Sequence, residues 1–482
     1  MKRLVWIGNT LAVGLLILGA CAPAAAPEII IQTQIVKETE IVKEQSVVEV
    51  TAVPGEVGVV TFAGFYPIDA PKGRWINSLG YRLEAEHPEC DFQYVEAPGI
   101  KGTEALLLRI QEGDPTVIGC NSASGSPTGG ELFKAGLVYD LSADMDTPPY
   151  GATEGKWFDT FSVSAQTQMS DYPGGVKLEV PYEPTNWVLW YNTDIYEKYG
   201  LKEPKTWPEL MANCEAIKQG SGDDISCIGG GGYPGYVTYW YSAIIHGLIN
   251  QTKGLWFGPY LEDKSKVVRL DSEVSLTAAK TLFDMVEAGY TTAGFLGGDF
   301  TLNQTVYFQG KAAHLYVGTW LIGEMSDVIP KDFKQNTTYF PAMPGGTGTY
   351  EWVTGTINAY GICKPGKKSE PSYSTDCGVQ FMKLYTSPDV SKDWVTAHST
   401  FASTKGAPGP DSIPGGTEVM ANLKEWSANL DGIYSYCPEV YSLVTDELIL
   451  YLDGSTSLEE FGANAQLAVE EAWGRCKVTL GG

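Results

Sequence analysis

Cysteine is the residue type with the clearest chemistry in this chain, because its thiol can form a disulfide or bind a metal ion. The chain has 9 cysteines and 4 histidines among 482 residues. No Cys-x-x-Cys pair occurs and the histidines are scattered, so the spacing does not favour a zinc site. Once Cys21 is set aside, an even number of cysteines remains. For a chain that leaves the cytoplasm, this indicates disulfides.

Near neighbours are the favoured partners where both cysteines fall within one local unit of structure. This reasoning predicts three disulfides, which join Cys214 to Cys227, Cys363 to Cys377 and Cys437 to Cys476. In the chain-entropy model, closing a loop of about 15 residues stabilises a fold by about 3 kcal/mol. A disulfide between Cys90 and Cys120 is awkward, because one cysteine precedes a predicted parallel strand and the other follows a different one. Whether these two pair stays open.

The amino-terminal residues have the three regions of a secretory signal. Met1-Lys2-Arg3 is followed by a mostly apolar run to Leu18 and then by Leu-Gly-Ala-Cys, ending at Cys21. The last four residues resemble the bacterial lipobox, in which the cysteine is lipidated and becomes the mature amino terminus. We therefore expect a signal peptide over residues 1–21 and a lipid anchor that holds the chain on the outside of the cell membrane.

Residues 22–55 have a composition that cannot close a core. They predict a tether, which would reach about 110 Å at roughly 3.3 Å per residue when fully extended. The alternating Ile and Val residues leave a short helix or a locally packed β-ribbon as the alternative.

The composition indicates a folded, acidic protein. The 43% hydrophobic and 12% aromatic content suits a large core, and the length allows two or three domains. Lys plus Arg number 33 against 58 Asp plus Glu, a net charge of -25. This charge repels nucleic acid and anionic lipid surfaces and fits a neutral or cationic ligand.

Two glycine-rich stretches resemble a phosphate-binding loop, but neither matches the full motif. Residues 228–235 lack the Lys-Ser/Thr that must follow, and residues 361–368 have Lys368 where the magnesium-binding hydroxyl must be. The chain also has no Gly-x-Ser-x-Gly and no His-Glu-x-x-His motif. We therefore expect no nucleotide, metal or other cofactor.

The segment after residue 56 alternates strands with helices, which predicts a parallel sheet. The predicted strands are 57–65, 91–97 and 116–120, and the predicted helices are 74–87 and 103–112. Ligands of such sheets lie beyond the carboxyl ends of the strands. This rule makes four residues candidates for ligand contact: Tyr66, Asp69, Asn121 and Ser122.

Residues 178–220 form the clearest local pattern, one strand followed by two capped helices. The strand over 178–191 contains Pro181 and Pro184, which confine it to an edge or to a crossing between two bodies. The expected helix signals are Asn192 and Thr193 at a first start, Gly200 at its end, and Thr206 with Glu209 as a second, capping-box start.

The order of residues in this region closely resembles a known family. The stretch VPYEPTNWVLWYNTDIYEKYGL followed by PKTWPEL is similar to the first crossover of solute-binding proteins of sugar ABC transporters, family 1, maltodextrin-binding type. Similarity continues in VYFQGKAAHLYVGTWLIGEM and in GVQFMKLYTSPDVSKDWVTAHSTFASTKGA. Where relatives often have Leu-Pro, this chain has Phe401-Ala402. The resemblance extends over nearly all of the chain after its first fifty residues.

The resemblance implies an α/β fold with two lobes, each a mostly parallel sheet flanked by helices, joined by three crossings. It places lobe 1 at 56–183 and 317–368, and lobe 2 at 184–316 and 369–482. It implies a monomeric binding protein rather than an enzyme, which captures a solute such as a sugar or oligosaccharide between the lobes. The partners would be the solute and the ABC permease, with no nucleic acid.

The resemblance also suggests which residues contact the solute. Trp187 lies where relatives place a ligand-contacting side chain, and Glu183 and Asn186 beside it offer hydrogen-bonding groups. Aromatic rings suit a sugar because its C–H faces stack on them. The further aromatic candidates are Trp240, Trp320 and Trp352. The alternative is that each tryptophan is a packed core residue.

Two other functions stay open at this point. A secreted glycoside hydrolase needs only a pair of carboxylic acids, for which Glu183, Asp69 and Asp299 are conceivable. A structural surface lipoprotein would bind nothing tightly. Product formation from oligosaccharides would reveal the hydrolase, and a ligand-dependent thermal shift would argue against the structural protein.

Overall fold

The computed structural model describes residues 57–64, 66–96, 117–119, 137–170, 175–232, 236–249, 268–298, 300–346, 352–363, 372–410, 425–428 and 438–479. The chain divides into two compact units, Met1–Thr51 and Ala52–Gly482, and every described residue belongs to the second. The predicted signal peptide, the lipidated Cys21 and the tether lie outside the described residues, as does the predicted helix at 103–112.

The smaller sheet contains the first strands of the chain. Its strands are β1 (Gly58–Gly64), β2 (Cys90–Glu96), β3 (Val117–Ile118) and β9 (Ile362–Cys363), in the order β2-β1-β3-β9. β1 pairs in parallel with β2 and β3, and β9 is antiparallel to β3. Between β1 and β2, the helix α1 (Pro71–Glu86) buries Ile76, Leu79 and Leu83, which share one helical face. The three predicted strands and the first predicted helix are thus confirmed, and the helix predicted between the second and third strands lies outside the described residues.

Further helices complete the smaller core. They are α4 (Ser142–Met145), the 3-10 helix η1 (Trp157–Thr160), α5 (Val163–Ser170), α12 (Ser372–Tyr385) and α13 (Pro388–His398). Phe381 of α12 stacks on Phe92 of β2, with ring centroids 4.7 Å apart. Segments that lie far apart in the sequence therefore build this core.

The larger sheet is organised around one long strand. Its strands are β4 (Val180–Asn192), β5 (Ser226–Gly229), β6 (Ala312–Gly318), β7 (Gln335–Thr338), β8 (Trp352–Tyr360) and β10 (Glu425–Ala428). The order is β10-β8-β4-β6-β5, and β7 also pairs with β4. Because β4 is antiparallel to β6, β7 and β8, this sheet is mixed rather than mostly parallel.

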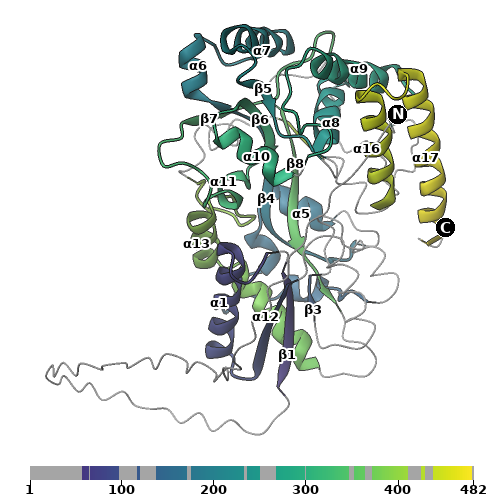
Figure 1. Ribbon diagram of the computed structural model, residues 1–482. Coiled ribbons are helices and arrows are strands. Elements are labelled where there is room, and N and C mark those ends of the chain that lie inside the picture. The colour runs from purple at the N-terminus through teal and green to yellow at the C-terminus, as the bar shows by residue number, and fades with distance from the viewer. Residues whose placement is uncertain are drawn as a thin grey trace, which may run out of the picture. The chain divides into compact units, whose positions relative to one another are not determined.

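Eight helices accompany the larger sheet in the described part of the chain. They are α6 (Thr193–Tyr199), α7 (Trp207–Ser221), α8 (Tyr236–Ile249), α9 (Glu273–Glu287), α10 (Phe300–Phe308), α11 (Leu321–Glu324), α16 (Pro438–Leu452) and α17 (Leu458–Thr479). The carboxy-terminal pair α16 and α17 lie side by side and pack against α9 (Figure 1).

The predicted caps of α6 and α7 are confirmed. The Asn192 side chain accepts a hydrogen bond from the backbone N–H of Ile195 at 3.0 Å, and Gly200 ends α6 with a φ of 65°. Thr206 and Glu209 form the capping box of α7. Such caps satisfy backbone donors and acceptors that the helix itself leaves unpaired. Each N-cap side chain typically adds about 1 kcal/mol to the stability of the protein.

Two hydrophobic cores correspond to two lobes. The smaller core includes Val180 and Tyr182 from the start of β4, and the larger core includes the residues from Trp187 to Trp190. β4 therefore passes from one core to the other, as predicted for this strand. β8 pairs with it over Val180↔Tyr360 to Trp187↔Thr354 and makes a second connection. Pro181 and Pro184 lie in the part of β4 that pairs with β8 and not with β6 or β7.

The lobe boundaries differ from the expected ones. Residues 321–343 contribute Leu321, Met325 and Phe340 to the larger core, although 317–368 was expected in lobe 1. Phe381 and Trp394 belong to the smaller core, although 369–482 was expected in lobe 2. The reason is that β6 ends within the larger sheet and turns into α11, so the expected second crossing is not there.

The disulfides agree with the prediction only in part. Cys214 and Cys227 are bonded as predicted, across 13 residues. Cys377 is bonded to Cys90 across 287 residues, so the predicted Cys363–Cys377 pair is wrong. The same bond answers the question that the sequence left open, because Cys90 does not pair with Cys120. α12 packs against β1 and β2, which brings these distant thiols together. Cys363 is itself disulfide-bonded.

The remaining predicted pair involves Cys437 and Cys476. Cys437 and the side chain of Cys476 lie outside the described residues. This pair therefore stays a prediction.

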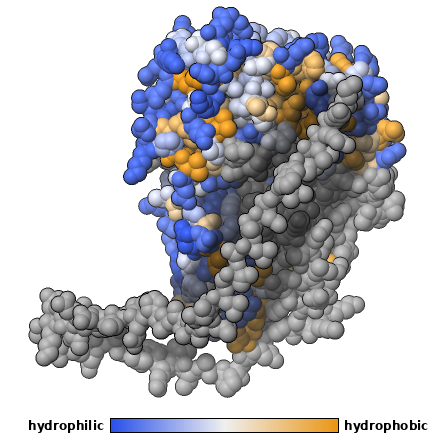
Figure 2. All heavy atoms as spheres, in the orientation of Figure 1, coloured by the Kyte–Doolittle hydropathy of each residue, from blue (hydrophilic) through white to orange (hydrophobic). Residues whose placement is uncertain are grey.

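The face of the described residues drawn in Figure 2 is mixed in hydropathy. Hydrophilic residues cover much of the face drawn in Figure 2, and hydrophobic ones gather over part of it. Within the described ranges, no helix is both long enough and apolar enough to span a membrane.

Candidate functional site

A buried ion pair lies at the junction of the two cores. Glu183 of β4 is fully buried, and its Oε1 lies 3.4 Å from the Nζ of Lys72 in the first turn of α1. The hydroxyl of Thr400 also donates to this carboxylate. A buried carboxylate is costly unless it is paired and hydrogen-bonded, so these partners are required where β4 leaves the smaller core.

Aromatic rings enclose the ammonium of Lys72. Its Nζ donates to the Tyr66 hydroxyl at 3.2 Å and lies 5.0 Å from the centre of that ring. On another side it lies 5.2 Å from the ring of Trp394. These cation–π contacts and the pairing with Glu183 hold the ammonium in place. The charge of Lys72 is thus engaged within the protein.

His398 adds an uncharged ring to the same neighbourhood. Its ring centroid is 4.4 Å from that of Trp394. Burial, and to a smaller extent the charge of Lys72, lower the pKa of His398 from 6.5 to about 3. The imidazole is therefore neutral at physiological pH and does not add to the positive charge of Lys72.

Glu324, at the end of α11, brings a second carboxylate from the larger core. The residue is exposed to solvent. Surrounding protein raises its pKa by desolvation, while hydrogen bonds from the side chains of Gln304 and Trp320 and the charge of Lys72 act in the opposite direction. A carboxylate that is both reached by solvent and partly desolvated lies in a recess rather than on a convex surface.

Two buried amide side chains of the junction keep unused hydrogen-bonding capacity. Gln304 donates from Nε2 to Glu324 Oε2 at 3.3 Å, and its Oε1 has no partner among the described residues. The Nδ2 of Asn186 likewise has none within the described ranges. Because buried polar atoms are normally paired, these two atoms are suited to meet a ligand or a water molecule.

Three aromatic rings stand beside these polar groups. Trp187 of β4 is fully buried and stacks on Tyr239 of α8, with centroids 3.6 Å apart and planes 25° apart. Trp320 meets the edge of Trp187 at 4.9 Å. Trp320 is only half-buried, so its ring keeps an accessible part. A ring of this kind can stack on an apolar face of a ligand.

The sequence Gly318-Thr319-Trp320 positions the exposed ring. A Cβ at Gly318 would lie 2.0 Å from the Trp320 ring, so only glycine fits there. The N–H of Thr319 donates to the Asn186 carbonyl at 2.9 Å, and the N–H of Asn186 donates to the Thr319 hydroxyl at 3.3 Å. These two bonds fasten the turn that carries Trp320 to β4.

Five of the residues predicted from the sequence lie at this junction. They are Tyr66, Glu183, Asn186, Trp187 and Trp320. Trp187 and Glu183 are fully buried, so they support the side chains around them and expose no surface to solvent.

The other predicted residues are placed elsewhere or lie outside the description. Trp240 is fully buried in the larger core against Tyr316 and Phe340. This position does not favour the predicted contact with a solute. Asp69 is exposed, and its carbonyl accepts a hydrogen bond from Arg74. The residues that the structure does not describe are Asn121, Ser122, Asp299 and the side chain of Trp352.

Sequence reasoning missed four residues of the junction. Lys72 and Gln304 lie outside the quoted stretches that resemble the family, and Lys72 is 111 residues from Glu183. Glu324 and Thr400 lie within such stretches, but no motif there marks them as site residues. A faint signal existed at Thr400, which precedes the Phe401-Ala402 departure from the family pattern. The positions of Lys72 and Glu324 depend on helix packing that a local pattern does not encode.

A cluster with metal-ligating residue types lies elsewhere, within the larger core. Cys214, Cys227 and His314 bring their Sγ and ring nitrogen atoms within 4.8 Å of one another. Both sulfurs are joined in a disulfide, so neither is the thiolate that a metal would need. The ring of His314 contacts the Tyr196 hydroxyl at 2.5 Å and the Cys227 carbonyl at 2.9 Å. The cluster is therefore structural.

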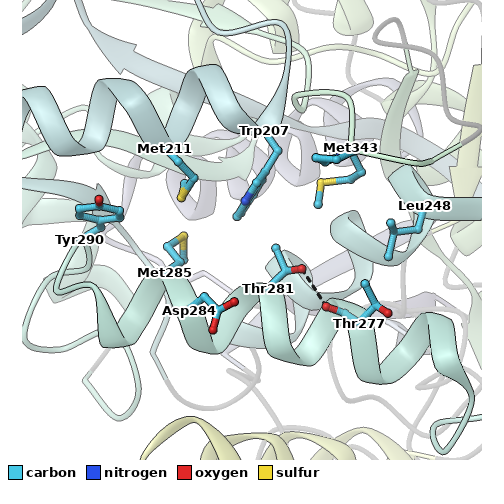
Figure 3. A pocket seen from close by; sticks show the side chains of 10 residues that line it. Trp207, Met211, Leu248, Thr277, Thr281, Asp284, Met285, Tyr290 and Met343 are labelled. Carbon is cyan, nitrogen blue, oxygen red and sulfur yellow. Dashed lines mark hydrogen bonds between the residues drawn. The ribbon is translucent and has the colours of Figure 1, made fainter.

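A pocket of about 440 Å³ opens on the larger core between α7, α8 and α9 (Figure 3). Met211 and Met285 face each other across it, and Trp207 forms part of the wall. Its polar groups are already engaged: Asp284 pairs with Lys280, and Thr281 donates to the carbonyl of Thr277. Little remains to orient a polar ligand, in contrast to the junction between the cores.

Two α/β lobes joined by crossing strands, with rings and polar groups at their junction, define a two-lobe binding fold. The family model described as "Bacterial extracellular solute-binding protein" matches residues 68–392. Because the match covers more than half of the chain, this protein belongs to that family. The family consists of binding proteins and not enzymes, which removes the hydrolase alternative.

Curated relatives and solved structures agree with this assignment. A "probable sugar-binding periplasmic protein" of Rhizobium meliloti is 26% identical over 323 residues, 64% of this chain and 71% of the relative. One of Brucella melitensis is 27% identical over 317 residues, 62% and 67% of the two chains.

Among solved structures, a chitin oligosaccharide binding protein aligns with a TM-score of 0.68 at 19% identity, over 87% of this chain and 100% of the other. A maltose-bound protein of T. maritima aligns with a TM-score of 0.66 at 17% identity, over 86% and 99%. At these identities the similarity concerns the fold, and it confirms the predicted two-lobe α/β class.

Proposed function

We propose that this protein captures a sugar or an oligosaccharide between its two lobes and delivers it to the permease of an ABC importer. The observation that carries the proposal is the half-buried ring of Trp320 beside polar groups from both cores. The names of the Rhizobium and Brucella relatives, and the sugars in the titles of two similar structures, support a carbohydrate.

The chemistry of the junction suits a polyhydroxylated ligand. A sugar ring has apolar C–H faces that stack on an aromatic ring and hydroxyls that both donate and accept hydrogen bonds. Trp320 supplies the ring, Glu324 an acceptor, and the free amide atoms of Gln304 and Asn186 an acceptor and a donor. Each of these groups comes from the larger core or from β4, and Tyr66 adds a hydroxyl from the smaller one.

Closure of the lobes would follow from this division of contacts. A solute shifts a conformational equilibrium only as far as it binds one state better than the other. A solute held by both lobes gains its full set of contacts only when they approach, and β4 and β8 can act as the hinge. The closed form would then be the one that the permease recognises.

The cellular setting in this proposal is the outside of the cell membrane. The lipobox-like stretch ending at Cys21 motivates a lipid anchor, and residues 22–55 would link it to the lobes. In this arrangement the protein acts as a monomer, and the two lobes follow the two cores, with the chain passing between them in β4, in β8 and between α13 and β10.

The decisive experiment combines ligand identification with a test of closure. Native mass spectrometry of the freshly purified chain, followed by calorimetry with maltotriose, xylotriose, stachyose and N,N′,N″-triacetylchitotriose, should reveal at least one bound sugar. Solution scattering at saturation with that sugar should show a smaller radius of gyration than the unliganded chain. Absence of binding across the panel argues against carbohydrate, and binding without compaction argues against the hinge. Appearance of shortened sugars would restore the hydrolase alternative.

A further inference from the structure

The charges at the junction are unequal in sign. Among the described residues, two carboxylates, Glu183 and Glu324, act on the neighbourhood of one ammonium, that of Lys72. Lys72 lowers the pKa of Glu324, and the charge of Glu183 raises it. Since His398 is neutral, it does not compensate the second carboxylate.

The hydroxyl of Tyr66 reports the same imbalance from the smaller core. Its pKa is raised well above 10, first by burial and then by the charges of Glu183 and Glu324. The phenol therefore stays protonated, and a negative charge placed near it would be disfavoured for the same electrostatic reason.

Lys72 is poorly placed to offset an incoming anion. Its ammonium already faces Glu183, the Tyr66 hydroxyl and the ring of Trp394, and its side chain is 4% exposed. Glu324, in contrast, is exposed and lies one helical turn from the half-buried Trp320. A ligand that stacks on Trp320 would thus meet a carboxylate and not an ammonium.

We propose that Glu324 sets the charge class of the solute, so that the site accepts uncharged or cationic hydroxylated molecules and rejects anionic ones such as uronates and sugar phosphates. This inference rests on the proposed function, because that function supplies the solute. The local electric field itself exists without any ligand. The net charge of -25 acts in the same direction at longer range.

The field is tested first, with small ions as probes. Caesium, iodide and neutral acrylamide quench tryptophan fluorescence, and the contribution of Trp320 is the difference between each chain and its Trp320→Phe form. At constant ionic strength, caesium should quench Trp320 better than iodide once both are scaled to free N-acetyltryptophanamide. In Glu324→Gln this preference should fall by about twofold or more, because a unit charge has been removed at a distance shorter than the Debye length.

The control removes the same charge elsewhere. Glu287→Gln changes an exposed carboxylate of α9, and the quenching preference of Trp320 should be unaffected by it. Glu324→Asp retains the charge and should behave as the unaltered chain. Equal quenching by caesium and iodide in the unaltered chain, or an unchanged preference in Glu324→Gln, would overturn the proposal.

Selectivity is tested second, with probes that differ in charge. The neutral probes are maltotriose and N,N′,N″-triacetylchitotriose, the cationic probe is chitosan triose, and the anionic probes are the two neutral probes oxidised to carboxylates at C6. Whichever neutral probe binds should bind more tightly than its anionic form. Glu324→Gln should reduce this discrimination about tenfold, equivalent to about 1.4 kcal/mol.

The two tests separate the two proposals. Equal affinity for a neutral probe and its anionic form refutes the role of Glu324 and leaves the sugar-binding function standing. If no oligosaccharide binds, the proposed function fails, while the quenching experiment still decides the sign of the field around Trp320.

Discussion

Trp187 and Trp320 touch each other, yet replacing Trp187 by alanine should mainly lower stability and replacing Trp320 should mainly lower affinity. Trp187 is fully buried between Tyr239 and Trp320. Removal of such a side chain costs about 3 to 5 kcal/mol. At about 2 to 4 °C per kcal/mol for a domain of 150 to 250 residues, the melting temperature should fall by about 6 to 20 °C. Trp320 is half-buried and leaves a smaller gap, so Trp320→Ala should destabilise by about 1 to 2 kcal/mol.

The assay compares melting of the unliganded variants with their affinity for the identified sugar. Trp320→Ala should lose affinity by about tenfold or more, in the range of one lost aromatic stacking contact. Trp240→Ala is the matched control, since Trp240 is equally buried in the larger core away from the junction. It should melt early and, where folded, bind normally. If Trp187→Ala melts like the unaltered chain, the ring is not the packed residue described here.

Three further predictions concern the rest of the chain. Peptide mapping without reduction should recover Cys90 linked to Cys377, whereas a peptide joining Cys377 to Cys363 would contradict the structure. Cys21→Ala should release the protein from membranes, and continued retention of the processed variant would argue against a lipid anchor. Burial lowers the pKa of His314 from 6.5 to about 4, so the unfolded chain binds the proton more readily between these values. Stability should therefore be full above pH 6.5 and decline by about 3 kcal/mol towards pH 4, and His314→Gln should flatten this part of the urea-unfolding profile.

Local signals in the sequence were sufficient where the structure depends on a few adjacent residues. The cap at Asn192, the stop at Gly200 and the capping box of Thr206 with Glu209 all formed as predicted. Each depends on side-chain chemistry within one helical turn. The same holds for the disulfide of Cys214, whose partner is 13 residues away.

Prediction was weakest where packing joins distant segments. The partner of Cys377 was misassigned because α12 packs on the first sheet although strands β4 to β8 separate the two in the sequence. Lys72 was missed for the same reason, since nothing near it in the sequence indicates that it meets Glu183. The predicted lobe boundary at residue 317 was wrong because β6, whose sequence resembles a crossing between lobes, ends within the larger sheet.

The bond between Cys90 and Cys377 also has a consequence for the order of events during secretion. If the chain leaves the cytoplasm amino end first, the thiol of Cys90 emerges 287 residues ahead of its partner, whereas Cys214 and Cys227 emerge almost together. An oxidant that acts on each thiol as it appears would offer Cys90 the wrong partners first. The lobe that begins the chain would then be sealed only after Cys377 has emerged, and its correct oxidation would depend on late pairing or on disulfide exchange.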